Sequence, residues 1–149
     1  MYSLTGTFWK SAPTIGDPHF EDTTLLIVSH DTTGSVGLIL NQPYHRRFNE
    51  LVEFKDYPPL PINIGGPVDQ EHLFLLHKDP ELVPGGMQVT KDWFYGGDFK
   101  VALTNLKNGS LAPVAIQLYL GYSGWDALQL EEEIEEGSWI TCAPPNRFI

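Results

Sequence analysis

The chain has 149 residues, is 42% hydrophobic and contains 4 Trp, 6 Tyr and 8 Phe, enough to bury the core of one domain spanning residues 1–149. Its formal net charge of −10 and its nine scattered Lys and Arg argue against direct nucleic-acid binding, which needs a cationic surface. With one cysteine (Cys142), no secretory signal pattern and no apolar run near the about 20 residues of a membrane helix, we expect a soluble, cytoplasmic protein without a disulfide.

The first half of the chain is predicted to consist mainly of strands. Residues 4–10 form the first candidate. Residues 24–29 and 35–40 are apolar, β-branched runs joined by the turn sequence of residues 31–34, a pattern typical of a β-hairpin. Residues 46–54 have the spacing of a short helix, and a proline-rich connector follows them.

The second half alternates strands with glycine breaks and contains two predicted helices. We expect strands over residues 61–64, 73–76, 114–122 and 138–142, a loop-rich stretch over 78–97, and helices over 99–106 and 126–136. The helix over 99–106 is followed by Asn108-Gly109, a sequence typical of a helix C-cap. Because strands outnumber helices and separate them, the chain is predicted to have an α+β fold on a mixed or curled sheet.

The most distinctive segment is Gly121-Tyr122-Ser123-Gly124-Trp125, which we predict to be a strand end followed by a glycine-bracketed turn. Ser123 has the position of a hydrolase nucleophile, but a nucleophile elbow needs a small residue where Trp125 stands. The segment therefore favours a structural turn over a catalytic serine.

The helix predicted over residues 126–136 carries six acids and no base, which is typical of a solvated face. At 100° per residue, Glu131 falls next to the apolar stripe of this helix, whereas Glu132, Glu133 and Glu136 face away from it. Glu131 is thus the carboxylate expected to be partly desolvated, in either a structural or a functional role.

None of the five histidines shows the close spacing of a metal site, so no metal is expected. His30 adjoins the predicted hairpin tip and is interpreted as either a ligand residue or a hydrogen-bonded structural histidine. Asn41 lies at the other end of the same hairpin, too far along the strands to share a site with His30 unless a bulge intervenes. His72 and His77 are five residues apart in a strand and should point to opposite faces.

The sequence Gly65-Gly66-Pro67 does not match a phosphate-binding loop and is interpreted as a sharp chain reversal. Cys142 lies among apolar residues of a late strand and is interpreted as an inert buried thiol.

Four groups of residues, each weak alone, form a specific combination. They are Gly6 with Pro13, Asp17 and Phe20; His30 with Gly34, Gly37-Leu38, Asn41 and Pro43; Gly65-Gly66-Pro67-Val68 with Leu76-His77; and Gly121-Tyr122, Gly124-Trp125 and Gln129-Leu130-Glu131 with Trp139. In this combination the chain resembles the YqgE/AlgH family of bacterial proteins of unassigned function. It departs from the family pattern at Ser29, Ser123 and Leu128, where an acid, an alanine and a glycine are usual.

The resemblance implies a compact α+β fold whose mixed, bifurcated sheet curls into a partial barrel with a few short helices. It implies no established reaction or cofactor. The family includes a proposed transcriptional regulator, and the acidity of this chain favours an indirect role through a protein partner or a small ligand.

We therefore predict a non-enzymatic binding or regulatory domain, without a cofactor and without direct contact with nucleic acid or membrane. No acid, base and nucleophile set can be assembled from the sequence; the alternative is a hydrolase or transferase that uses His30 or His77 with Glu131. A homodimer is compatible with the aromatic content. The candidate ligand- or partner-binding residues are His30, Asn41, Gly65, Gly66, Pro67, Val68, His77, Tyr122, Trp125 and Glu131.

Overall fold

The computed structural model describes residues 3–149, with His19 described in its backbone alone. Its strands are β1 (Phe8–Ser11), β2 (Thr24–Asp31), β3 (Gly34–Ile39), β4 (Ile62–Ile64), β5 (Val68–His77), β6 (Met87–Gln88), β7 (Phe94–Tyr95), β8 (Ile116–Asp126) and β9 (Trp139–Thr141). The α-helices are α1 (Phe99–Lys107) and α2 (Gln129–Glu135), and five short 3-10 turns complete the described elements. Within residues 3–149, neither α-helix has the length and apolar character needed to cross a bilayer.

All nine strands belong to one sheet with the order β6-β7-β5-β8-β3-β2-β1-β9, in which neighbours are antiparallel, while β4 joins β8 in parallel beside this path. The predicted α+β class is confirmed. The sheet does not curl into the partial barrel that the family resemblance implied. Within the described residues β6 and β9 end the path without pairing with each other, and closure requires the two end strands to pair.

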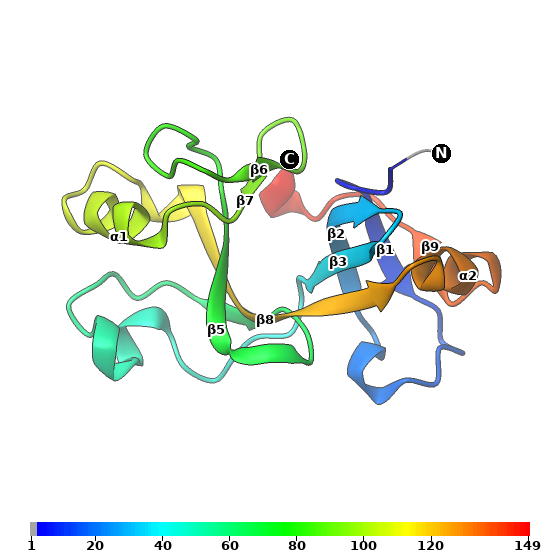
Figure 1. Cartoon of the computed structure of the whole chain (residues 1–149). Helices are drawn as coiled ribbons and strands as arrows, with labels where there is room; N and C mark the ends of the chain where they lie inside the picture. Colours follow the sequence, from blue (N-terminus) through cyan, green and yellow to red (C-terminus); the bar gives the residue numbers. More distant parts are fainter. Residues whose placement is uncertain (1–2) are drawn as a thin grey trace.

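Strand β8 is the axis of the molecule, running between α1 at one end and α2 at the other (Figure 1). Its first half pairs with β4 and β5, and its last four residues pair with β3. Between the two halves lies Gly121, whose left-handed backbone (φ +68°) is one that glycine adopts without strain. The turn predicted over residues 121–125 is therefore wrong, because the ladder with β3 carries the strand on to Asp126.

Two other predictions differ from the structure. Residues 46–54 form two separate 3-10 turns, because Leu51 between them has an extended backbone (ψ 133°) that interrupts helical hydrogen bonding. The loop-rich stretch 78–97 contains β6 and β7, which are only two residues long each and leave little pattern in the sequence.

The predicted helix over 99–106 is confirmed as α1. The side chain of Asp98 accepts a hydrogen bond from the amide of Val101 at its start, and Gly109 at φ +85° follows its last turn.

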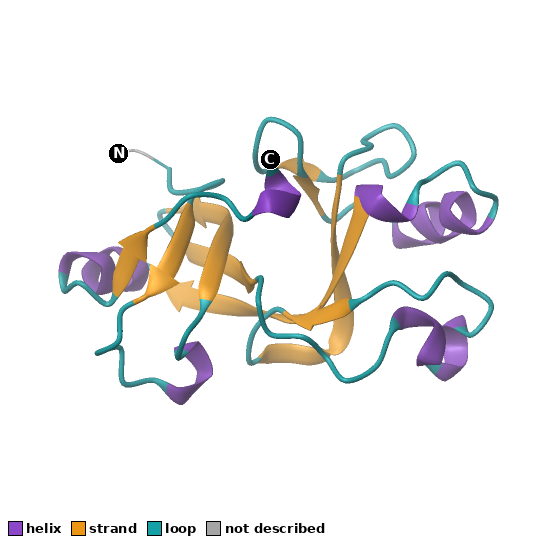
Figure 2. Cartoon of the chain, turned by 180° about the vertical axis from the view of Figure 1, so that it is seen from behind, coloured by secondary structure: helices purple, strands orange, loops and turns teal. Residues whose placement is uncertain are grey.

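Figure 2 shows the sheet extending between the two α-helices, and three apolar clusters pack along its length. One packs around α1, β4 and the first half of β8, and a second lies between the two ends of the sheet. The third lies under α2, where Leu25, Ile27 and Trp125 meet Leu130. This third cluster includes Trp125 and packs beneath the helix that carries Glu131, two of the candidate binding residues.

Candidate functional site

The connection from β4 to β5 crosses the backbone of β8. Residues 118–120 pair with β4 and β5 at once, so these two strands lie on opposite edges of β8 and the connection must pass over it. A Cβ on Gly65 would lie 2.4 Å from the carbonyl oxygen of Gly121, and one on Gly66 would lie 2.2 Å from the carbonyl group of Tyr122. Only glycine permits this approach. The glycine pair thus serves a backbone crossing rather than a simple chain reversal.

The last residues of β8 have an open edge. Ser123–Asp126 pair with β3 on one side, whereas β5 reaches β8 on the other side only as far as the Val68–Tyr122 pair; no other described strand adjoins them there. The amide of Asp126 donates to Oε1 of Gln129 (2.9 Å), so it points away from β3. Since alternate residues of a strand present their backbone groups to the same edge, Gly124 also faces the open side.

None of the residues that the structure describes covers Gly124 at this edge. The residue is exposed, and a Cβ placed on it would contact only the ring of Tyr122, at 3.7 Å. The neighbouring side chain of Val68 is exposed as well. The edge is therefore accessible to another extended chain.

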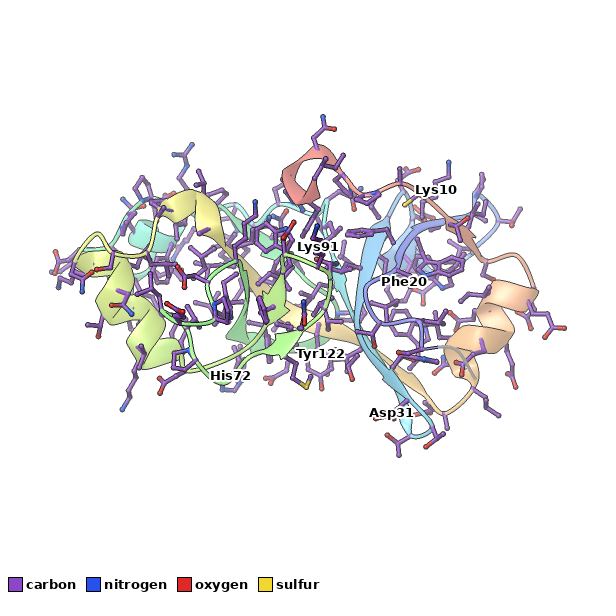
Figure 3. All side chains as sticks on the ribbon, turned by 90° about the horizontal axis from the view of Figure 1, so that it is seen from above. Lys10, Phe20, Asp31, His72, Lys91 and Tyr122 are labelled. Atoms are coloured by element: carbon purple, nitrogen blue, oxygen red, sulfur yellow. The ribbon has the colours of Figure 1, made fainter. Side chains whose placement is uncertain are left out.

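Two hollows of about 410 and 440 Å³ flank this edge and share Val68, Gly124 and Trp125. Acidic residues line both: Asp17, Glu133 and Glu136 in the first, and Asp31 and Asp126 in the second. No described Lys or Arg lines either hollow. Figure 3 shows Asp31 projecting at the tip of the β2–β3 hairpin. The surface is thus electrostatically suited to a cationic ligand.

Glu133 holds the aromatic wall of the first hollow in place. Its Oε1 accepts hydrogen bonds from the indole N–H groups of Trp125 (3.0 Å) and Trp139 (2.9 Å). Its Oε2 accepts from the side-chain Nε2 of Gln129 (3.2 Å). Phe20 stacks on Trp125 with ring centroids 5.9 Å apart. The expectation that Glu133 is solvated is wrong, because two tryptophans from β8 and β9 reach the side of α2 that lacks its own apolar residues.

The structure brings His30 and Glu131 together. A bulge in β2 between Ile27 and Ser29 shifts the alternation of side chains, which places His30 on the face that α2 covers. His30 Nε2 lies 3.1 Å from Glu131 Oε2, and the two side chains are 2% and 31% exposed. The two atoms form a close polar contact without the alignment of a hydrogen bond.

The surroundings of His30 do not form a nucleophile and base pair. The amide of Leu4 donates to Nδ1 (3.0 Å), which leaves the proton of the neutral ring on Nε2, facing Glu131. Ser35 pairs with His30 across the hairpin, and its buried hydroxyl makes no hydrogen bond with any described residue. Because the amide of Leu4 takes the lone pair of Nδ1, His30 has no free acceptor nitrogen with which to activate a serine.

His77 and Asn41 lie apart from this pair. His77 is fully buried, its Nε2 facing the carbonyl of Gly96 (3.1 Å) and its Nδ1 accepting from the amide of Asp79 (3.3 Å); burial lowers its pKa. Asn41 bridges the amide of Thr24 and the carbonyl of Asp22 at the far end of the hairpin. Both side chains are occupied by backbone groups, and neither contacts Glu131.

Sequence reasoning missed Gly124, Asp126, Gln129 and Glu133. The i, i+4 spacing of Gln129 and Glu133 was a usable signal for their contact, whereas the open edge could not be read without knowing how far β5 extends. Among the side chains described, no cluster of three or more His, Cys, Asp or Glu is placed to hold a metal ion.

The fold and site together define a class: an α+β protein with an open acidic strand edge on a branched sheet. The chain belongs to the AlgH-like family, whose family model matches residues 8–149, and the predicted resemblance is confirmed. The UPF0301 protein CT0663 of Chlorobaculum tepidum is 37% identical over 126 residues, covering 85% of this chain and 67% of its own. The UPF0301 protein BF2109 of Bacteroides fragilis is 34% identical over 145 residues, covering 97% and 74%.

Two solved structures share the fold. The solution structure of the AlgH protein from Pseudomonas aeruginosa matches with a TM-score of 0.77 and 29% identity, covering 96% of this chain and 78% of that one. The crystal structure of protein DIP2367 from Corynebacterium diphtheriae gives the same TM-score of 0.77 at 20% identity, with coverage of 99% and 80%, and shows the fold alone.

Proposed function

We propose that this protein is a non-enzymatic binding domain that takes up a basic, extended segment of a partner protein along the open edge of β8. The observation that carries the proposal is the exposed backbone of Gly124 between two acid-lined hollows. A strand added at such an edge gains main-chain hydrogen bonds, and pockets for its side chains provide specificity.

The arrangement of the hollows fits the geometry of an added strand. Successive side chains of an extended chain point to opposite faces of a sheet. The two hollows share Val68, Gly124 and Trp125, so alternate residues of a segment docked there enter one hollow or the other. Because acids line both, Lys or Arg side chains are favoured.

A second copy of this chain is a poorer occupant. A two-fold pairing of β8 edges would bring Asp126 and the acids of both hollows against the same groups of the other copy, in a protein of net charge −10. The acidity likewise supports regulation through a protein partner over direct contact with DNA.

Binding is also better supported than a hydrolase or transferase reaction. The rival hypothesis relies on His30 or His77 acting with Glu131. The Nδ1 lone pair of His30 accepts from the amide of Leu4, and both nitrogens of His77 are hydrogen-bonded to backbone groups, so neither ring has a free acceptor nitrogen to serve as a base.

The test uses three synthetic hexapeptides: alternating Lys and Val, alternating Glu and Val, and the Lys-Val peptide with alternate backbone amides methylated. Amide NMR spectra of the labelled protein monitor each titration. We expect the Lys-Val peptide to shift the signals of Val68, Gly124 and Asp126, and the other two peptides to bind at least about tenfold more weakly.

A pair of substitutions that each add one positive charge provides the test and its matched control. Val68→Lys introduces a cation at the edge, whereas Ile140→Lys places one at a similarly exposed strand position on β9 (38% and 43% exposed). Only Val68→Lys is expected to weaken binding of the Lys-Val peptide. Equal effects of the two substitutions, or equal binding of the acidic peptide, would overturn the proposal.

A further inference from the structure

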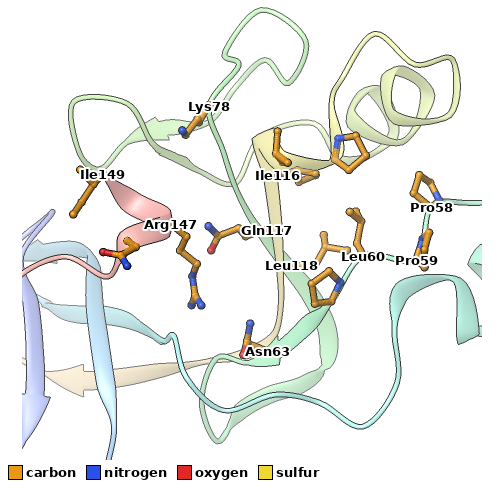
Figure 4. A pocket seen from close by; sticks show the side chains of 14 residues that line it. Pro58, Pro59, Leu60, Asn63, Lys78, Ile116, Gln117, Leu118, Arg147 and Ile149 are labelled. Atoms are coloured by element: carbon orange, nitrogen blue, oxygen red, sulfur yellow. The ribbon is translucent and has the colours of Figure 1, made fainter.

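A cavity of about 690 Å³ lies away from the β8 edge, between the connector before β4, the start of β8 and the C-terminal 3-10 turn (Figure 4). Its volume is within the range typical of small-molecule sites. One side is apolar, formed by Pro58, Pro59, Leu60 and Leu118. The cavity is therefore large enough and sufficiently apolar to hold a small organic molecule.

The opposite side of the cavity is cationic and polar. Lys78 and Arg147 line it together with Asn63 and Gln117, and no Asp or Glu side chain lines it. This is notable because the chain has 19 acids against nine Lys and Arg. Within the described residues, neither cation forms an ion pair with an acidic side chain. Lys78 Nζ lies over the ring of Trp93, 5.1 Å from its centroid, which leaves its positive charge without a carboxylate partner. Two such cations beside an apolar wall suit an anion with a hydrocarbon part.

Arg147 is held rigidly for such a role. Its guanidinium donates to the backbone carbonyl of Leu40 and contacts the hydroxyl of Tyr119, which itself donates to Gln117 Oε1 (2.6 Å). Burial raises the pKa of Tyr119 to about 12, and Arg147 partly opposes that shift. These contacts use only some of the five guanidinium donors, so others remain for a ligand.

We propose that this cavity binds a small amphipathic carboxylate. The carboxylate group is placed on the side of the cavity that Arg147 and Lys78 line, and its hydrocarbon part lies against the proline wall and Leu118 (Figure 4). The site is independent of the β8 edge, since the two share no lining residue. Recognition therefore rests on charge at one end of the cavity and apolar burial at the other.

Isothermal titration calorimetry of the whole chain with octanoate, octanol and octylammonium tests the assignment. Octanoate is expected to bind at least about tenfold more tightly than octanol, because the alcohol lacks the charge that the two cations recognise. Octylammonium is expected not to bind. Equal affinity for octanoate and octanol, or no heat of binding with octanoate, would overturn the proposal.

Two matched pairs of variants locate the site. Val114→Asp places a carboxylate on the rim of the cavity, and Val52→Asp adds the same charge elsewhere, at nearly identical exposure (86% and 87%). Lys78→Gln removes a lining cation, and Lys91→Gln removes an exposed one that lines no described hollow. Val114→Asp and Lys78→Gln are each expected to weaken octanoate binding about tenfold, with melting temperatures showing that both remain folded. Loss of binding in the control variants alone, or in no variant, would refute the site.

Discussion

Replacing Gly66 by alanine is expected to lower the free energy of unfolding by about 2–4 kcal/mol. The added Cβ would lie 2.2 Å from the carbonyl carbon and oxygen of Tyr122 and 2.4 Å from Ser123 Oγ, so two backbones must separate. Overpacking of this kind costs about 1–3 kcal/mol, and losing the Ser123 hydrogen bond to the carbonyl of Gly65 (3.1 Å) adds about 1 kcal/mol.

Urea denaturation followed by tryptophan fluorescence measures this difference. Gly124→Ala is the matched control, because Gly124 lies near the same crossing yet its added Cβ would meet only the Tyr122 ring at 3.7 Å. The control is expected to stay within about 0.5 kcal/mol of the wild type. If the two substitutions cost the same, the crossing is not the reason for the glycine pair and the reasoning is refuted.

Other substitutions test the remaining contacts. Glu133→Ala, which leaves two buried indole N–H groups without an acceptor, should cost about 2–4 kcal/mol in urea denaturation, against less than about 0.5 kcal/mol for the exposed Glu132→Ala; similar costs would contradict the role of Glu133. Because burial lowers the pKa of His77 below its ordinary 6.5, the unfolded chain binds this proton first, so the stability that His77 provides is present above pH 6.5 and is lost on acidification. The difference in unfolding free energy between wild type and His77→Gln should therefore shrink below pH 6.5, and a difference that grows there would show the wrong sign. Leu128→Gly should stabilise the protein by about 0.5–1 kcal/mol, because Leu128 is half-exposed and has a left-handed φ of 66°; a lower melting temperature would count against this.

Several elements were predictable from local sequence because their causes are local. The hairpin of β2 and β3 follows from two β-branched runs and a turn sequence. Helix α1 follows from apolar spacing with caps at both ends. The acidic helix was also predicted, although it begins only at Gln129, after Leu128 in the left-handed conformation.

The candidate site was predictable only in part. The sequence identified Val68, Tyr122 and Trp125, which line the hollows beside β8, and it singled out both His30 and Glu131. It named these two together only in the alternative enzyme hypothesis and could not establish that they touch, because their contact depends on the bulge in β2. A bulge shifts the facing of every later side chain and leaves no mark in an apolar run.

By itself, the sequence determined the α+β class, the main hairpin, the two helices and membership of the AlgH-like family. The tertiary structure decided that residues 121–125 continue a strand, that Gly65 and Gly66 lie across it, and that Arg147 reaches a cavity wall. The physical reason is separation along the chain. Ser123 and Gly65 are 58 residues apart, and Arg147 and Leu40 are 107 apart. Such contacts depend on how the whole sheet is assembled, and no local propensity encodes them.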